Sequence, residues 1–189
     1  VVIAGIEDFP PNQFKMRMLE GGCWNYDRRL LVMGLRDPFN LFARPMYMSS
    51  AKWIRWLDYA REFLGLTNFL GDCVKVNYNQ WCVDIEYRKK ISAQLGWEFC
   101  DEGIDDVPHL GSSYDGKSYQ GRAREMKLRE RWKEMQPEEF ERYARMFPPE
   151  ILELSRQIFG QVVPLEFEER IKETNYESVR RQMANQKRN

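Results

Sequence analysis

The sequence has no long apolar run, no closely paired cysteines and almost no histidine, and each absence excludes a class of protein. None of its apolar segments approaches the roughly 20 residues that a transmembrane helix needs, so we expect no membrane span. Its four cysteines, Cys23, Cys73, Cys82 and Cys100, form no Cys-x-x-Cys pair. Free, buried thiols in a reducing compartment such as the cytoplasm are therefore expected, rather than a zinc site. The single histidine, His109, excludes a multi-histidine metal centre.

The chain also lacks an excess of either charge. Its 29 basic and 29 acidic side chains cancel, so no overall field favours nucleic acid or an anionic membrane as a partner. An anion site must therefore be local. The sequence Gly-x-x-x-x-Gly-Lys-Ser occurs at 111–118, so a nucleotide kinase is an alternative interpretation.

Apolar runs alternate with helical spacing through the first hundred of the 189 residues. The expected strands are 1–6, 30–35 and 73–78, and the expected helices of this part are 13–19, 39–47, 50–64 and 84–95. Strands that alternate with helices indicate an α/β fold, in which crossover helices connect the strands of a parallel sheet. The chain is long enough for one such core. Because it begins abruptly inside an apolar run, we also expect that a segment upstream of Val1 is missing or was removed.

The second half of the chain reads differently. Residues 101–121 are rich in Gly, Asp and Ser and show no period, which predicts a long loop that is either functional or disordered. The expected helices after it are 123–135, 137–147 and 149–159. We divide the chain into an α/β domain over 1–160 and a charged, partly helical tail over 161–189, with a helical stretch near 166–172 and a basic, frayed end.

The segment 30–44, LLVMGLRDPFNLFAR, contains the most informative pattern. A buried strand ends at Leu35, Pro38 suits the first turn of a helix, and Asp37 is placed to cap that turn. Arg36 would then lie at the carboxyl end of a strand and beside a helix N-terminus, where α/β sheets bind ligands and phosphates in particular. The alternative is a surface arginine paired with a nearby carboxylate.

The ends of the other two expected strands offer further polar groups. Glu7 follows the first strand, and Asn77, Tyr78 and Asn79 follow the third. A carboxylate and an arginine in one crevice suit a transfer reaction, in which the carboxylate accepts a proton and the arginine neutralises a phosphate. For Glu7, a helix cap or a salt bridge to Arg36 is an equal alternative.

The loop at Gly111-Ser112-Ser113 offers hydroxyls and successive backbone N–H groups, which commonly hold phosphate oxygens. Arg122 follows it and could reach back into the site, although a solvated charge is the alternative. His109 is a second candidate for a catalytic base, against an incidental loop histidine. We expect the aromatic side chains of the helix at 50–64 to pack in the core; a stacking platform for a base or sugar is the second interpretation.

The order LLVMGLRDPFNLFAR, CVKVNYNQWCVDIEYRKKISAQLGW, VPHLGSSYDG, LRERW and ILELSRQIFG resembles the sulfotransferase family that uses 3′-phosphoadenosine 5′-phosphosulfate. The likeness is nearest to bacterial and phage members and extends to about residue 160. It implies a P-loop-NTPase-like three-layer α/β sandwich with a helical C-terminal part. It also implies transfer of a sulfuryl group, without a metal, to a hydroxyl or amine of a small-molecule or carbohydrate acceptor.

The resemblance also implies roles for individual residues. Arg36 matches the arginine that binds the 3′-phosphate of the co-substrate, and Glu7 matches the catalytic base. Ser112 and Ser113 match a loop beside the co-substrate or acceptor. At Arg44 the family usually has a serine that joins the 3′-phosphate site, so here a charge replaces a hydroxyl or the pocket is altered.

One family element is missing from the sequence. The 5′-phosphosulfate loop, a Lys or Arg followed by Ser-Gly-Thr-Thr, occurs nowhere, and its expected place is upstream of Val1. Without that loop nothing grips the sulfuryl group, whose developing charge must be stabilised in the transition state. Two hypotheses follow: a sulfotransferase whose upstream segment is missing here, or a non-catalytic relative kept as a binding or assembly module.

Overall fold

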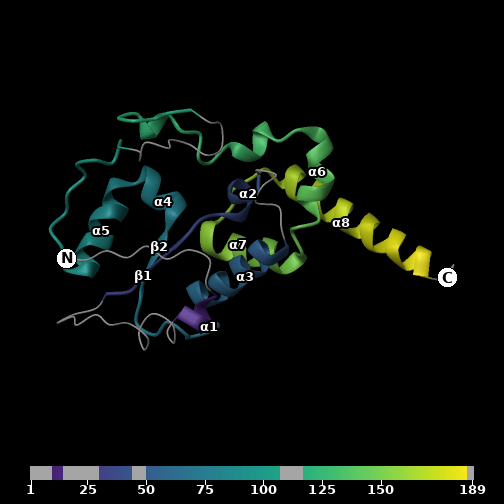
Figure 1. The fold of residues 1–189 in the computed structure, drawn as a ribbon, viewed down its shortest axis with the longest axis horizontal. Helices are drawn as coiled ribbons and strands as arrows, with labels where there is room; N and C mark the ends of the chain where they lie inside the picture. Colours follow the sequence, from purple (N-terminus) through teal and green to yellow (C-terminus); the bar gives the residue numbers. More distant parts are fainter. Residues whose placement is uncertain (1–9, 15–29, 44–49, 107–116, 187–189) are drawn as a thin grey trace.

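The computed structural model describes residues 10–14, 30–43, 50–106 and 117–186, and Figure 1 shows their arrangement. In chain order the elements are α1 (Pro11–Phe14), β1 (Val32–Leu35), α2 (Pro38–Leu41), α3 (Ser50–Leu64), β2 (Val74–Asn77), α4 (Tyr78–Val83), α5 (Ile85–Leu95), the 3-10 turns η3 (Ala123–Glu125) and η4 (Arg131–Glu134), α6 (Pro137–Ala144), α7 (Pro149–Phe159) and α8 (Leu165–Gln186). The described part is thus mainly helical, with one small sheet.

That sheet consists of β1 and β2, which run parallel with Leu35 opposite Asn77. The helices α2 and α3 lie between the two strands in the chain, as the crossover of a parallel pair requires. α3 packs against β1, and α5 packs against β2. Because the strands are parallel and in register, their carboxyl ends open at the same edge.

The expectation of a mixed α/β fold with a parallel sheet is confirmed, but a three-layer sandwich is not. Among the described residues the sheet has two strands, and the expected strand at 1–6 lies outside them. Along β1 the side chains alternate: Met33 and Leu35 are buried, whereas Val32 is 50% exposed. The described residues therefore cover one face of β1, where burial on both faces was expected.

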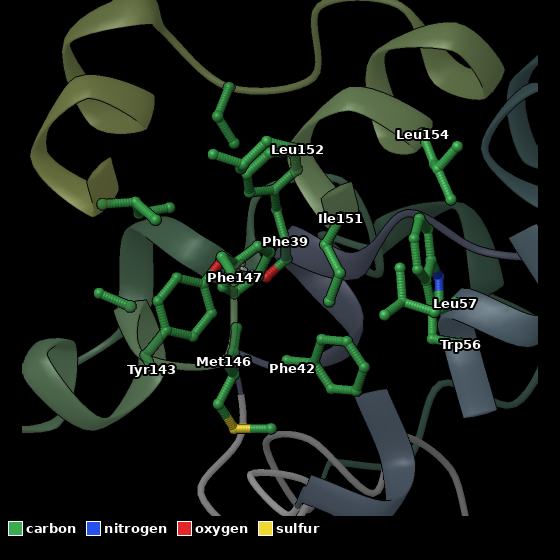
Figure 2. Close-up of a cluster of buried hydrophobic side chains, with 14 of the residues drawn as sticks. Phe39, Phe42, Trp56, Leu57, Tyr143, Met146, Phe147, Ile151, Leu152 and Leu154 are labelled. Atoms are coloured by element: carbon green, nitrogen blue, oxygen red, sulfur yellow. Dashed lines mark hydrogen bonds between the residues drawn. The ribbon is translucent and has the colours of Figure 1, made fainter. Parts of the chain in front are cut away.

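Aromatic rings form the centre of the main core, which Figure 2 shows. The ring of Phe147 stacks on Phe39 with centroids 5.2 Å apart and lies 4.7 Å from the ring of Tyr143. The Tyr143 hydroxyl donates to the Phe39 carbonyl oxygen at 2.9 Å. This core joins α2 to α6 and to the turn that follows α6, although the two helices are separated by about a hundred residues.

The stripe of α3 belongs to the same core, as expected. Trp56, Leu57 and Ala60 are buried, and Trp53, Tyr59 and Phe63 pack against the cluster from partly buried positions. Helical spacing places these residues on one side of the helix, which faces α7.

Local capping explains where several helices begin and end. Asp37 caps α2 by accepting a hydrogen bond from the Asn40 N–H at 2.8 Å, and Pro38 occupies the first turn, both as expected. Asp84 caps α5 through the N–H groups of Glu86 and Tyr87. Gly96 ends α5 with a φ of 70°, a conformation that favours glycine.

Three sequence expectations for the helices need correction. The segment 123–135 is not one α-helix but two 3-10 turns joined by irregular chain. The Leu128 carbonyl oxygen bonds Arg36, and Trp132 and Met135 pack against the core, so tertiary contacts override the helical spacing of this segment. The helix expected at 39–47 is described only as the four-residue α2. The helical stretch expected near 166–172 extends instead through the 22 residues of α8.

The helix α8 begins on the body of the protein and then extends beyond it, as the yellow ribbon in Figure 1 shows. Its first turns join the core through the buried residues Glu168 and Ile171. It is highly charged, and no helix among the described residues is long and apolar enough to cross a membrane.

The thiols also differ from expectation. Cys73 and Cys82 are half-buried and Cys100 is exposed, so full burial is wrong for all three described cysteines. All three are free.

A buried carboxylate holds the loop between α3 and β2. Glu62 accepts hydrogen bonds from the Thr67 hydroxyl and from the N–H groups of Phe69 and Leu70, at 2.6 to 3.0 Å. Burial by itself raises the pKa of Glu62, but these three hydrogen bonds outweigh it and hold the pKa below its ordinary value. Glu62 therefore stays ionised and fixes the path of the chain into β2.

Replacing the central ring of the core tests this description. Phe147→Ala removes a fully buried ring that contacts the rings of Phe39, Phe42 and Tyr143, and we expect it to lower the free energy of unfolding by about 3–5 kcal/mol. Urea denaturation followed by tryptophan fluorescence measures the change. Leu66→Ala is the control, because Leu66 is 66% exposed, and we expect it to change stability by less than about 0.5 kcal/mol. Equal effects of the two substitutions would contradict the placement of the core.

Candidate functional site

The carboxyl ends of the two strands bring polar residues from both sides of the crossover together. Arg36 and Asp37 directly follow β1, and Asn77 ends β2 with Tyr78 and Asn79 after it. The two strand ends are adjacent because Leu35 pairs with Asn77. The expected position of Arg36 at the carboxyl edge of a parallel sheet is confirmed.

The peptide group between Arg36 and Asp37 is held from both sides. Its carbonyl oxygen, that of Arg36, accepts a hydrogen bond from the indole N–H of Trp56 at 2.9 Å. Its N–H, that of Asp37, donates to the side-chain oxygen of Asn79 at 3.3 Å. Since a peptide group is planar, two contacts on opposite sides fix the direction in which the chain leaves the strand.

The guanidinium of Arg36 lies along the edge of the sheet. Its Nη2 donates to the carbonyl oxygen of Leu128, which belongs to the segment between η3 and η4. Its central carbon lies 5.8 Å from the centre of the Tyr78 ring, within the range of a cation–π contact. Arg36 is partly buried and makes no ion pair with another described residue, so its charge is not neutralised by them.

Asp37 differs from its neighbour in being fully buried. Its Oδ1 accepts from the N–H and the side-chain amide of Asn40, and its Oδ2 accepts from the Asn79 amide at 2.8 Å. Burial raises the pKa of Asp37, while the Asn40 N–H, the Asn79 amide and the charge of Arg36 oppose the increase. With both oxygens engaged and no exposed surface, Asp37 cannot serve as the proton acceptor of a transfer reaction.

Asn77 is engaged as well. Its side-chain oxygen caps α4 through the Gln80 N–H, and its amide donates to the Ile158 carbonyl oxygen at 3.0 Å. Its own N–H donates to the Tyr87 hydroxyl at 2.9 Å. These contacts join the end of β2 to α5 and α7, so Asn77 supports the edge structurally.

Arginines surround the aromatic end of the site. The Tyr78 hydroxyl and the Cys82 thiol are hydrogen-bonded, and burial raises the pKa of both groups. The charges of Arg36 and Arg131 act against this increase at Tyr78, and those of Arg36, Arg88 and Arg129 act against it at Cys82. Arginines thus lie near this edge in a chain whose net charge is zero.

One of these arginines is committed to structure. The guanidinium of Arg88 forms two hydrogen bonds of 2.7 Å with the carboxylate of Asp101 and one of 2.8 Å with the Trp81 carbonyl oxygen. Arg88 is buried and its donors are largely used, so it ties α4, α5 and the chain at Asp101 together rather than binding a ligand.

The remaining candidates from the sequence are not brought to this edge. Arg122 is exposed and bonds Glu125 and the Ser118 carbonyl oxygen, as a solvated charge would. The others, Glu7, Arg44, His109, Ser112 and Ser113, lie outside the described residues.

Sequence reasoning missed the residues that hold Arg36 in place. Asp37 was expected only as a helix cap, Asn79 only as a polar group at a strand end, and Trp56 only as core. The signal for Asp37 and Asn79 was present, because each follows its strand by two residues. The contact with the Leu128 carbonyl oxygen could not be predicted from the sequence, because every residue has a backbone carbonyl oxygen.

The Arg88–Asp101 pair makes a prediction about pH. Its hydrogen bonds with Arg88 hold the pKa of Asp101 below the ordinary value. The pair's contribution to stability is therefore complete above the unfolded-state pKa of about 3.9 and disappears as the pH falls through the lower native pKa. We expect Asp101→Asn to be less stable than the wild type at pH 7, with a difference that shrinks in acid. Urea denaturation across pH measures it, with Asp106→Asn as control, and a difference that is constant with pH would contradict it.

Neither the protein-family models, nor the curated proteins, nor the solved structures with which the chain was compared contain a match. The chemistry around Arg36 and the order of the sequence motifs are what a functional proposal rests on.

Proposed function

We propose that this chain is a sulfotransferase that takes a sulfuryl group from 3′-phosphoadenosine 5′-phosphosulfate, and that Arg36 binds the 3′-phosphate of this co-substrate. The observation that carries the proposal is the position of the Arg36 guanidinium, a fixed cation at the carboxyl edge of two parallel strands. Ligands of open α/β sheets bind at this edge. The motif that resembles the family's 3′-phosphate segment supplies this same arginine.

The residues at the edge suit a phosphate. Only Nη2 of Arg36 has a hydrogen-bond acceptor among the described residues, and a guanidinium has five N–H donors for the planar recognition of an oxyanion. The charges of Arg131 and Arg129 act on the neighbouring side chains of Tyr78 and Cys82, respectively. The neighbouring carboxylate of Asp37 bonds amides rather than the guanidinium, so it leaves the donors of Arg36 to a ligand.

The helix N-terminus beside Arg36 contributes less than the sequence suggested. α2 has only four residues, Pro38 has no N–H, and the Asn40 N–H is already bound by Asp37. The side chain of Arg36, rather than a helix dipole, is therefore the proposed anion ligand.

The proposed chemistry assigns the remaining candidates. An oxygen or nitrogen of the acceptor attacks the sulfur, the bond between sulfur and the phosphate oxygen breaks, and adenosine 3′,5′-bisphosphate leaves. Glu7 accepts the proton of the acceptor, with His109 as the second candidate for this role. Ser112 and Ser113 hold phosphate oxygens, and Arg44 and Arg122 add charge to the co-substrate site. The acceptor class is a small-molecule or carbohydrate hydroxyl or amine.

The second function, a binding module without catalysis, is favoured by the absence of a Lys/Arg-Ser-Gly-Thr-Thr loop from the sequence. Such a module would still bind the 3′-phosphate through Arg36 but would not bind the sulfuryl group. Nucleotide binding and sulfuryl transfer are therefore measured separately.

Calorimetry with adenosine 3′,5′-bisphosphate and adenosine 5′-monophosphate tests the proposal, because the two ligands differ only in the 3′-phosphate. We expect the bisphosphate to bind more tightly, and Arg36→Ala to weaken it roughly 10- to 100-fold, the equivalent of about 1.5–3 kcal/mol for a charge-assisted hydrogen bond. Arg145→Ala is the matched control, since Arg145 is exposed and bonds Glu141 on α6.

Three outcomes separate the functions. Equal binding of the two nucleotides overturns the 3′-phosphate site. Preference for the bisphosphate with release of adenosine 3′,5′-bisphosphate from the phosphosulfate in the presence of acceptors supports the sulfotransferase. The same preference without any release supports the binding module.

A further inference from the structure

The contact between Asp37 and Asn79 is reciprocal and is not explained by helix capping. The Asn79 amide donates to Oδ2 of Asp37 at 2.8 Å, and the Asn79 side-chain oxygen accepts from the Asp37 N–H at 3.3 Å. One side chain from beyond β2 thus holds both the backbone and the carboxylate of the residue that follows Arg36. The two partners are 42 positions apart in the chain.

The two oxygens of Asp37 differ in their main partners, although the Asn40 side-chain amide also lies 3.0 Å from Oδ1 and 3.2 Å from Oδ2. Oδ1 accepts from the Asn40 N–H at 2.8 Å, which caps α2. Oδ2 faces Asn79, which takes no part in the cap. A cap needs only one acceptor oxygen, so the second oxygen and Asn79 form an additional device.

This device acts on the peptide group from which Arg36 extends. The Trp56 indole holds the carbonyl side of that group, and Asn79 holds the N–H side. If the contact with Asn79 is lost, the peptide group can rotate about the remaining contact, and the direction of the Arg36 side chain changes with it. Asp37 is fully buried, so water cannot substitute for the lost partner.

We infer that Asp37 and Asn79 are positioning residues that aim the Arg36 guanidinium at the 3′-phosphate, and that they thereby set the preference of the site for a nucleotide that carries this phosphate. The inference rests on the proposed function and names the residues that determine its specificity. Neither residue contacts the ligand. Both act through Arg36.

The pair permits an exchange test because a carboxylate and an amide of equal shape face each other. Asp37→Asn sets two amide groups against each other, and Asn79→Asp sets two carboxylates against each other. In the double variant Asp37→Asn/Asn79→Asp the amide of residue 37 donates to the carboxylate of residue 79, and the oxygen of residue 37 still caps α2. The double variant therefore restores the pattern with its donor and acceptor reversed.

The readout is the ratio of the dissociation constants for adenosine 5′-monophosphate and adenosine 3′,5′-bisphosphate, measured by calorimetry. We expect each single variant to lower this ratio by about tenfold, a coupling within the range of contacting polar pairs, while the affinity for the monophosphate is unchanged. The double variant should return the ratio to within about threefold of the wild type. A purely structural role would lower both affinities together and leave the ratio as it was.

Asn79→Ala keeps the test decisive if a buried pair of like groups prevents folding. It removes the contact with Asp37 and leaves the cap of α2 intact, and Gln80→Ala is its control because Gln80 is exposed on the same helix. A lowered ratio for Asn79→Ala with an unchanged ratio for Gln80→Ala supports the inference. An unchanged ratio for Asn79→Ala, in a wild type that prefers the bisphosphate, overturns the inference alone. A wild type without preference overturns the proposed function and the inference with it.

Discussion

The parallel pairing of β1 with β2 is the constraint on which the rest of the site depends. In this register Leu35 lies opposite Asn77, so the chain leaves both strands at the same level. A slip of one residue would place the side chains of a strand on the opposite face. Arg36 would then no longer be followed by a residue within reach of Asn79, and the Trp56 indole would no longer meet the Arg36 carbonyl oxygen. The geometry of the edge is therefore a consequence of strand register more than of any single polar contact.

The aromatic core supports that register from the other side. Phe39 lies three residues beyond Arg36 and packs on Phe147, while its carbonyl oxygen accepts from the Tyr143 hydroxyl. The helix after β1 is short, and rings from the C-terminal half pack on it in addition to its own cap and backbone hydrogen bonds. Trp56 belongs both to this core and to the edge, because its ring is buried and its N–H reaches the Arg36 carbonyl oxygen. Trp56 thus connects the core to the site, so a loss of order in the core would also displace Arg36.

Apolar spacing and the backbone preferences of proline and glycine predicted helix bounds that depend on neighbouring residues in the chain. The helix at 50–64 and the helix at 149–159 have the bounds that their apolar spacing predicted, and Pro38 and Gly96 lie at the helix boundaries where their backbone preferences place them. The predicted helix at 123–135 was wrong, since its backbone is drawn to the sheet edge, where the Leu128 carbonyl oxygen accepts from Arg36. The Asp37–Asn79 pair could not be predicted either. It depends on tertiary proximity, and each residue alone is consistent with a turn or a cap. The candidate Arg36 was predicted from its own segment, whereas the residues that aim it became visible only once the strands were paired.

The balance of charge at the edge shows how a neutral chain can carry a local cation. Asp37 directly follows Arg36, and a simple count would let the two charges cancel. The structure separates them: the carboxylate is buried and engaged by amides of Asn40 and Asn79, while the guanidinium is only partly buried and bonds a carbonyl oxygen. Hydrogen bonds from amides stabilise a carboxylate and leave the cation unpaired, whereas an ion pair with Arg36 would pair the two charges. The oxygens of Asp37 are engaged by Asn40 and Asn79 and not by the guanidinium. This division between two adjacent residues leaves the charge of Arg36 unpaired among the described residues, as the proposed 3′-phosphate site requires.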